Sequence, residues 1–170
     1  MVRLPSWLIP NNLINVIWPA DMDPYNLDRF LYAQYGVYAD VLAEIRSGRK
    51  RSHWMWFIFP QLDGLAFSST SRFYAIKSLV EAAAYLEHPE LGPRLLECTD
   101  AVLSQRGRSA SQVFGHPDDL KLKSCMTLFA SASEQGSAFE KVLEGFYLGQ
   151  RDERTLQLLA GSGGKGNMPS

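Results

Sequence analysis

The sequence predicts a mainly α, single compact helical domain, and three observations support this prediction. The chain has 170 residues, which is enough for one domain and too few for two of ordinary size. Hydrophobic residues make up 46% of the chain and aromatic residues 12%, so a sizeable core can form. Apolar residues recur mostly at the spacing of a helix, and only residues 54–59 are ambiguous with a strand. We therefore expect about seven helices.

The chain is expected to begin with an irregular N-terminal arm over residues 1–22. Prolines and an asparagine pair divide this segment into apolar runs shorter than the ~7 to 15 residues that a signal peptide needs. Trp7 and Trp18 are costly to expose to water, which favours docking of the arm on the domain or on a neighbouring chain. A homo-oligomer held together by the arm is therefore one expected assembly. Met22 could serve as an alternative start of the chain.

The helical domain is expected over residues 23–160, and start and stop signals divide its first part. The Asp23–Pro24 pair opens a short helix near residues 27–31. The next helix is predicted over residues 37–45, where apolar residues share one face, and Gly48 is its stop signal.

The later helices have clearer signals at their first residues. Ser78 and Glu81 have the spacing of a capping box, in which the side chain of each residue accepts a hydrogen bond from the backbone amide of the other. This pattern predicts a helix that begins at residue 79. The Gly-rich end, residues 161–170, is expected to be a flexible tail. The predicted helices in this part of the chain cover residues 79–86, 91–103, 109–115, 117–129 and 139–147, with a last short turn at 155–159.

The most unusual segment covers residues 49–61, where cations are followed directly by aromatic residues. Guanidinium groups bind phosphate and an indole can stack on a base, so this pattern favours binding of a nucleotide-like small molecule. The expected ligand-binding residues here are Arg51, His53, Trp54 and Gln61. The alternative is that the aromatic run crosses the core while the cations only solvate the preceding turn.

A loop rich in serine follows Gly64 and leads into another helix. Free amides at the start of a helix can bind an anion, so Ser71 and Tyr74 are expected beside the same ligand. The alternative is that the hydroxyl groups only cap the helix.

A third set of candidates lies on the helix predicted over residues 117–129. Lys121 and Ser124 share one face of this helix and could reach a ligand, and Asp119, on another face, is the third candidate. The alternative is an ordinary surface ion pair between Asp119 and Lys123, which are four residues apart. Polar groups inside apolar segments need partners, so we expect the candidates of all three segments to converge on one site.

Composition excludes several other classes of function. A net charge of −1 argues against broad nucleic-acid binding, which needs a basic surface. Two cysteines cannot form a disulfide framework, and the spacing of the histidines and cysteines suggests neither a metal site nor a catalytic triad. The glycine-rich motifs that bind dinucleotides or nucleoside triphosphates are missing, so no cofactor is expected. No run of 18 apolar residues is present, so no membrane span is expected. We expect a cytoplasmic location.

Several sequence blocks, in order, resemble the domain-of-unknown-function 1810 family. The resemblance covers residues 25–159 and implies a small, mainly helical domain without an established activity. The blocks that carry it are Arg49–Leu62 (RKRSHWMWFIFPQL), Tyr74–Ile76, Tyr85–Leu95, Val113–Gly115 and Asp118–Phe129.

A fainter likeness is to the YbiA-like group, named NADAR for its link to NAD and ADP-ribose. The likeness lies in the order of an aromatic pair at Phe73–Tyr74, a His-Pro-Glu-Leu segment at 88–91 and a helix that ends in Met126. It implies a ligand or substrate derived from ADP-ribose. The Glu-His pair that precedes the aromatic pair in that group is Ser71–Arg72 here, so the acid needed for such hydrolysis is not in its expected place.

Two functions of different class follow from these observations. The first is a nucleotide-type ligand-binding protein or a hydrolase of an ADP-ribose derivative. The second is a non-catalytic protein-interaction module that uses an exposed aromatic surface. A concave pocket between the three candidate segments favours the first function, and an aromatic patch on an open surface favours the second.

Overall fold

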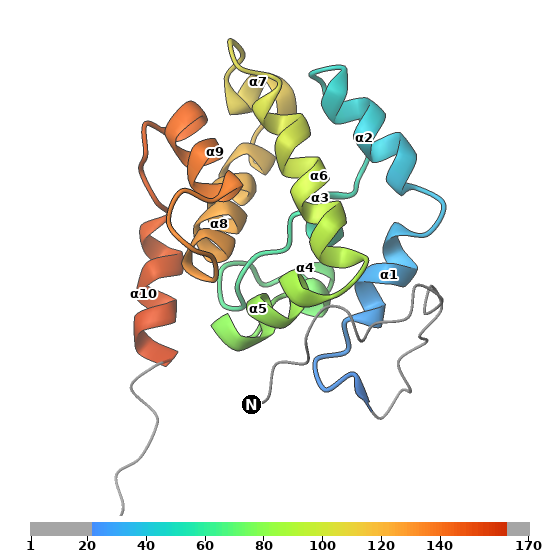
Figure 1. The fold of residues 1–170 in the computed structure, drawn as a ribbon, viewed down its shortest axis with the longest axis vertical. Helices are drawn as coiled ribbons and strands as arrows, with labels where there is room; N and C mark the ends of the chain where they lie inside the picture. Colours follow the sequence, from blue (N-terminus) through green and yellow to red (C-terminus); the bar gives the residue numbers. More distant parts are fainter. Residues whose placement is uncertain (1–21, 163–170) are drawn as a thin grey trace, which may run out of the picture.

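The computed structural model describes residues 22–162, and this part of the chain contains ten α-helices and no β-strand. The prediction of a mainly helical domain is confirmed (Figure 1). The predicted arm before Met22 and the predicted tail after Ser162 lie outside the described residues. The helices are α1 (Asp28–Gln34), α2 (Tyr38–Arg46), α3 (Met55–Ile58), α4 (Ser69–Tyr74), α5 (Leu79–Glu87), α6 (Leu91–Leu103), α7 (Ala110–Phe114), α8 (Asp118–Ser131), α9 (Ala138–Tyr147) and α10 (Glu153–Ser162).

About seven helices were predicted, and the described residues contain ten because three elements were not counted among those seven. The ambiguous segment at 54–59 contains the single turn of α3, and the serine-rich loop leads into the short α4. The predicted last turn is a full helix, α10, which takes in the first two residues of the predicted tail.

Helix α8 forms the centre of the core. It contacts α5, α7, α9 and α10, and every residue from Ser124 to Ala130 is buried. A helix that is buried on all sides cannot show the one-sided apolar stripe of a surface helix. The Thr127 hydroxyl, buried at its middle, donates to the Lys123 carbonyl and accepts from the Asp152 amide, which fixes the start of α10.

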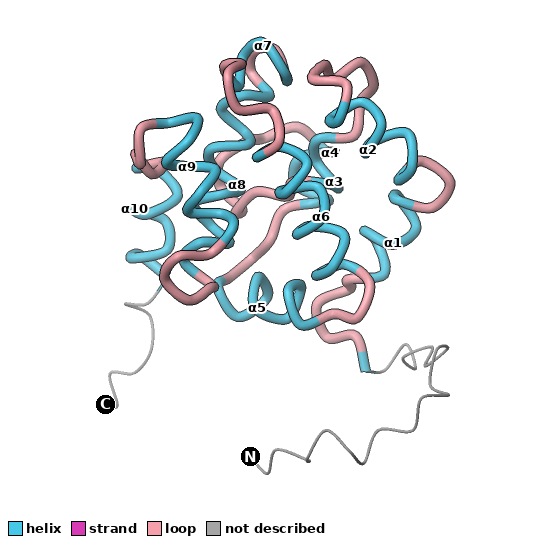
Figure 2. The backbone as a smooth tube through the Cα atoms, turned by 45° about the horizontal axis from the view of Figure 1, so that its top comes forward, coloured by secondary structure: helices cyan, strands magenta, loops and turns pink. Residues whose placement is uncertain are grey.

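The loop-rich stretch around α3 and α4 crosses the interior between the helices (Figure 2). Leu62 and Ile76 pair there in an isolated parallel bridge. Within residues 54–59, Trp56 and Phe57 are only half-buried, whereas the other four side chains are buried. Successive residues of a helical turn point about 100° apart, so six of them cannot all face one core.

The predicted helix signals act largely as expected. Gly48 ends α2 with a φ of +74°, a conformation that glycine adopts without strain. The Ser78 hydroxyl accepts from the Glu81 amide and caps α5. Glu81 does not complete the capping box, because its carboxylate accepts from the Lys77 amide and pairs with Arg29 instead.

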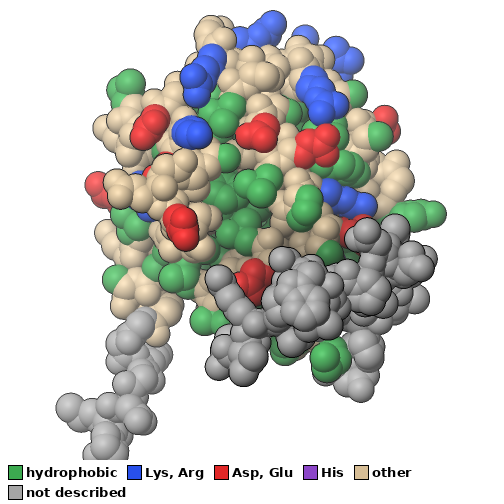
Figure 3. Space-filling view, in the orientation of Figure 1, with side chains coloured by type: hydrophobic (Ala, Val, Ile, Leu, Met, Phe, Trp, Pro, Cys, Tyr) green, Lys and Arg blue, Asp and Glu red, His purple; other side chains and the backbone are tan. Residues whose placement is uncertain are grey.

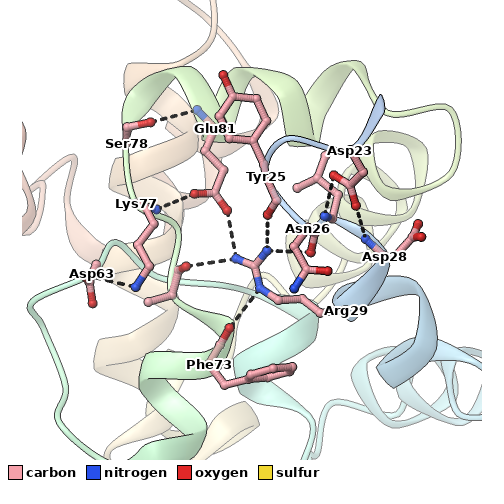
Figure 4. Close-up of polar contacts among 12 residues, drawn as sticks. Asp23, Tyr25, Asn26, Asp28, Arg29, Asp63, Phe73, Lys77, Ser78 and Glu81 are labelled. Atoms are coloured by element: carbon pink, nitrogen blue, oxygen red, sulfur yellow. Dashed lines mark hydrogen bonds and ion pairs between the residues drawn. The ribbon is translucent and has the colours of Figure 1, made fainter. Parts of the chain in front are cut away.

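The Arg29 guanidinium joins the start of the domain to α4 and α5 (Figure 4). It pairs with Glu81 at 2.8 Å, and only 7% of the Arg29 side chain and 2% of the Glu81 side chain are exposed. It also donates to four backbone carbonyls, those of Tyr25, Asn26, Phe73 and Ala75. Each nitrogen of this buried guanidinium therefore donates hydrogen bonds to the protein. A buried charge needs such partners to offset the loss of water.

Candidate functional site

Three of the expected ligand-binding residues, Gln61, Ser71 and Tyr74, line one small depression. Trp56 forms another wall of it, beside Leu62 and Leu65. The depression measures about 10 Å³, which is the space of a single water molecule. The structure thus brings these residues together without leaving room between them for a nucleotide.

Lys121 does not line this depression, but it contacts Trp56, which does. Its ammonium lies 4.9 Å from the centre of the indole ring, a distance that allows a cation–π contact. The same ammonium pairs with Asp118 at 3.0 Å, and Asp118 pairs on its other side with Lys50 at 2.8 Å. Partial burial acts to raise the pKa of Asp118, but the hydrogen bonds from the two lysines outweigh it and lower the pKa below its ordinary value. Asp118, which the sequence prediction missed, is therefore held as a carboxylate between two cations.

The carboxylate of Glu44 shapes the basic loop before α3. It accepts from the backbone amides of Arg51 and Ser52, from the Ser52 hydroxyl and from the Trp54 indole N–H. Partial burial acts to raise the pKa of Glu44, but these four hydrogen bonds outweigh it and lower the pKa to about 2. Trp54 is accordingly a buried structural residue whose only polar side-chain atom is already bonded.

The remaining candidates lie elsewhere. His53 is exposed and lines a different depression, with Trp54, Glu44 and Phe57. On α8, Asp119 accepts from the Ser111 hydroxyl and pairs with His116 at 3.2 Å. The alternative pairing of Asp119 with Lys123 does not occur among the ion pairs of the described residues, because the Lys123 ammonium lies over the ring of Tyr147.

Ser124 and Arg51 also lie outside this depression. The buried Ser124 hydroxyl donates back to the Leu120 carbonyl of its own helix. Arg51 is exposed on the loop before α3. The expected convergence of all nine residues thus reduces to Gln61, Ser71 and Tyr74, with Lys121 adjoining them through Trp56.

An open groove between α1 and α4 is larger than this depression. Tyr32, Phe73 and Tyr74 form its aromatic walls, and Asn26, Arg29 and Ala33 complete it. Tyr32 is 80% exposed and Phe73 is 55% exposed. The Phe73 and Tyr74 rings meet edge to face with 4.8 Å between their centres. Sequence reasoning missed Tyr32 and Phe73 because exposure of an aromatic residue on a short helix has no local sequence signal.

The two thiols are unsuited to nucleophilic chemistry. Cys98 and Cys125 are both free and buried. Burial raises the pKa of Cys98 to about 12 and that of Cys125 well above its ordinary value, so neither forms the reactive thiolate near neutral pH. In residues 22–162 no three His, Cys, Asp or Glu side chains are grouped closely enough to hold a metal ion. None of the helices in this range is both long and apolar enough to cross a membrane.

These features define a small, single-domain helical protein with an open aromatic groove. The chain belongs to the family described as "Protein of unknown function (DUF1810)", which matches residues 24–159, so the first resemblance is confirmed. It is similar to the conserved hypothetical protein Rv1873 from Mycobacterium tuberculosis, whose crystal structure has 55% sequence identity and a TM-score of 0.80. That match covers 81% of this chain and 99% of the other. No curated protein matches the chain.

Proposed function

We propose that this domain is a non-catalytic protein-interaction module and that the groove between α1 and α4 is its binding surface. The observation that carries the proposal is the exposure of Tyr32 and Phe73 on either side of that groove. Large aromatic side chains that stay exposed beside one another are typical of binding surfaces, since tyrosine and phenylalanine contribute much of the contact energy in interfaces.

Part of the groove is held in place by contacts with the core. The Tyr74 ring packs against the rings of Phe30 and Phe57, with 5.8 Å and 5.6 Å between the ring centres, so one wall of the groove is anchored in the core. The Phe73 carbonyl accepts from the buried Arg29 guanidinium at 2.9 Å, which fixes the end of α4 relative to α1. A surface that is already ordered loses little conformational entropy on binding.

The test uses peptides selected for binding to the intact chain from a random library. We expect the selected peptides to bind at least about tenfold more weakly to the Tyr32→Ser/Phe73→Ser variant, since that loss corresponds to ~1.4 kcal/mol. The matched control is Phe67→Ser, which removes a 73% exposed ring outside the groove and should leave affinity unchanged. Equal binding by the groove variant and the wild type would exclude this surface.

A nucleotide-type ligand is the second candidate, and the contact of Lys121 with Trp56 favours it. The depression beside Gln61 and Ser71 is too small for a nucleotide, so such a ligand would lie over the surface outside it, with the Lys121 ammonium as its phosphate anchor. The likeness to the ADP-ribose-linked group makes derivatives of ADP-ribose the first ligands to try, as bound species or as substrates of hydrolysis.

A thermal-shift screen of nucleotides and ADP-ribose derivatives tests this second function. A ligand at 100 times its dissociation constant adds ~2.7 kcal/mol to the free energy of unfolding and raises the melting temperature. Lys121→Met should abolish that rise, whereas Lys123→Met, on the same helix but over Tyr147, should keep it. A rise that survives Lys121→Met would place the ligand elsewhere.

A further inference from the structure

The near-neutral net charge of the chain conceals a local excess of cations in two segments. Residues 44–53 and 104–112 together hold six arginines and lysines and a single carboxylate, Glu44, although the whole chain has a net charge of −1. The first segment contains the loop between α2 and α3, and the second contains the loop between α6 and α7. Lys and Arg side chains gather at this end of the molecule, over α7 and the neighbouring end of α2 (Figure 3).

The two loops form one continuous surface, which we call the arginine surface. The Gln105 side-chain amide donates to the Arg46 carbonyl at 3.1 Å, and the Lys50 amide donates to the Val113 carbonyl at 2.7 Å. Between these two bonds the Arg108 guanidinium lies against the backbone of Gly48, where an added Cβ would come within 3.0 Å of it. Cations far apart in the sequence are thereby fixed as neighbours.

Four arginines of this surface remain available to a partner. Lys50 is turned inward to Asp118, and Arg46 pairs with Glu97 at 3.2 Å. Arg49, Arg51, Arg106 and Arg108 are exposed, and none of them is within ion-pair distance of a carboxylate in residues 22–162. The nearby Glu44 does not neutralise them, because its oxygens are taken by backbone amides, a hydroxyl and the Trp54 indole.

We propose that the arginine surface binds the phosphate backbone of a double-stranded nucleic acid. All four available cations are arginines, whose planar forks bind phosphate oxygens in pairs. The exposed phenylalanine and tyrosine side chains of the described part of the chain, Tyr32, Tyr35, Phe67 and Phe73, lie outside both loops, so backbone contacts rather than base stacking are expected. A duplex presents phosphates on a stiff line that several arginines reach together, whereas an acidic peptide must first be ordered.

The test is fluorescence anisotropy of the full chain with two short DNA duplexes of unrelated sequence. The wild type should bind both equally, with a dissociation constant of roughly 1 to 100 μM near physiological salt, as backbone contacts predict. The triple variant Arg49→Gln/Arg51→Gln/Arg108→Gln should bind at least about tenfold more weakly and should reduce the slope of log affinity against log salt by about 2 to 3, at ~0.9 per lost phosphate contact.

The matched control removes three exposed cations outside the arginine surface. Arg72→Gln/Lys141→Gln/Arg154→Gln changes the net charge by the same amount and should leave affinity and salt slope nearly unchanged. Equal losses in the two variants would show that only net charge matters and would overturn the proposal. So would absence of binding by the wild type at low salt, or competition by polyglutamate as effective as that by DNA, which would assign the surface to an acidic protein. Melting curves of all three proteins ensure that folded chains are compared.

Discussion

At the scale of single residues, the side chain of Glu44 organises the basic loop by bonding four donors at once. Glu44→Gln removes the charge from these bonds, and we expect a loss of about 1 kcal/mol, since the site is partly solvated. The wild-type pKa falls from 4.5 to about 2 on folding. The carboxylate therefore stabilises the fold fully above pH 4.5 and loses its effect as the pH falls towards 2.

Urea denaturation of wild type and Glu44→Gln between neutral pH and pH 2 tests this prediction. The difference in free energy of unfolding should shrink as the pH falls through that range. Glu144→Gln, an exposed site on α9, should show no such trend. A difference that is constant with pH would contradict the assignment.

His88 acts as a second single-residue device, at the start of α6. Its Nδ1 accepts from the amides of Glu90 and Leu91 at 3.1 and 3.2 Å, which requires the neutral ring. Burial lowers the pKa of His88 below 6.5, so this stabilisation is complete above that pH and is lost as the pH falls through the lowered folded-state pKa. His88→Ala should cost about 1 kcal/mol at pH 8 and less at pH 5, measured as a difference in melting temperature. A cost that grows towards pH 5 would show that the ring is bound in its charged form.

At the scale of elements, the junction of α5 and α6 depends on the absence of a side chain at Gly92. A Cβ there would lie 2.0 Å from the backbone carbonyl oxygen of Leu86, so the helices would have to move apart. Gly92→Ala should lower the free energy of unfolding by about 3 kcal/mol or more, as overpacking against backbone does.

Gly145, in the last turn of α9, is the matched control for this prediction. A Cβ there meets nothing within 4 Å and the backbone is not left-handed. Gly145→Ala should therefore stabilise the protein by about 0.5 to 1 kcal/mol through its higher helix propensity. If thermal unfolding ranks the two alanine variants the other way, the contact between α5 and α6 is not as close as described.

At the scale of the whole molecule, Arg29 ties together segments that are about fifty residues apart in the sequence. Arg29→Met leaves the Glu81 carboxylate and several carbonyls unpaired in the interior, and we expect a loss of about 3 to 5 kcal/mol. The exposed pair of Arg46 and Glu97 offers the contrast, since Arg46→Met should cost less than about 1 kcal/mol. Urea denaturation of both variants measures the difference. Similar losses of unfolding free energy in the two variants would contradict the importance assigned to Arg29.

The candidate site shows where sequence reasoning ends at this larger scale. Gln61, Ser71 and Tyr74 were identifiable because polar residues inside apolar blocks need partners, and they do share one depression. His53 lies apart from them because the Glu44 carboxylate, ten residues before Trp54, shapes the loop that carries it. The exposure of Tyr32 and Phe73 depends on how α1 and α4 meet, which no local pattern specifies.

By itself, the sequence determined the helical class and the position of most long helices. Those features depend on local interactions: the Ser78 cap, the left-handed turn at Gly48, and apolar spacing along α2, α6 and α9. Only the tertiary structure decided the burial of Arg29, the half-exposure of Trp56 and the joining of two loops into the arginine surface. Each of these arises from contacts between residues distant in the chain, and such contacts have no period or motif that a linear sequence can show.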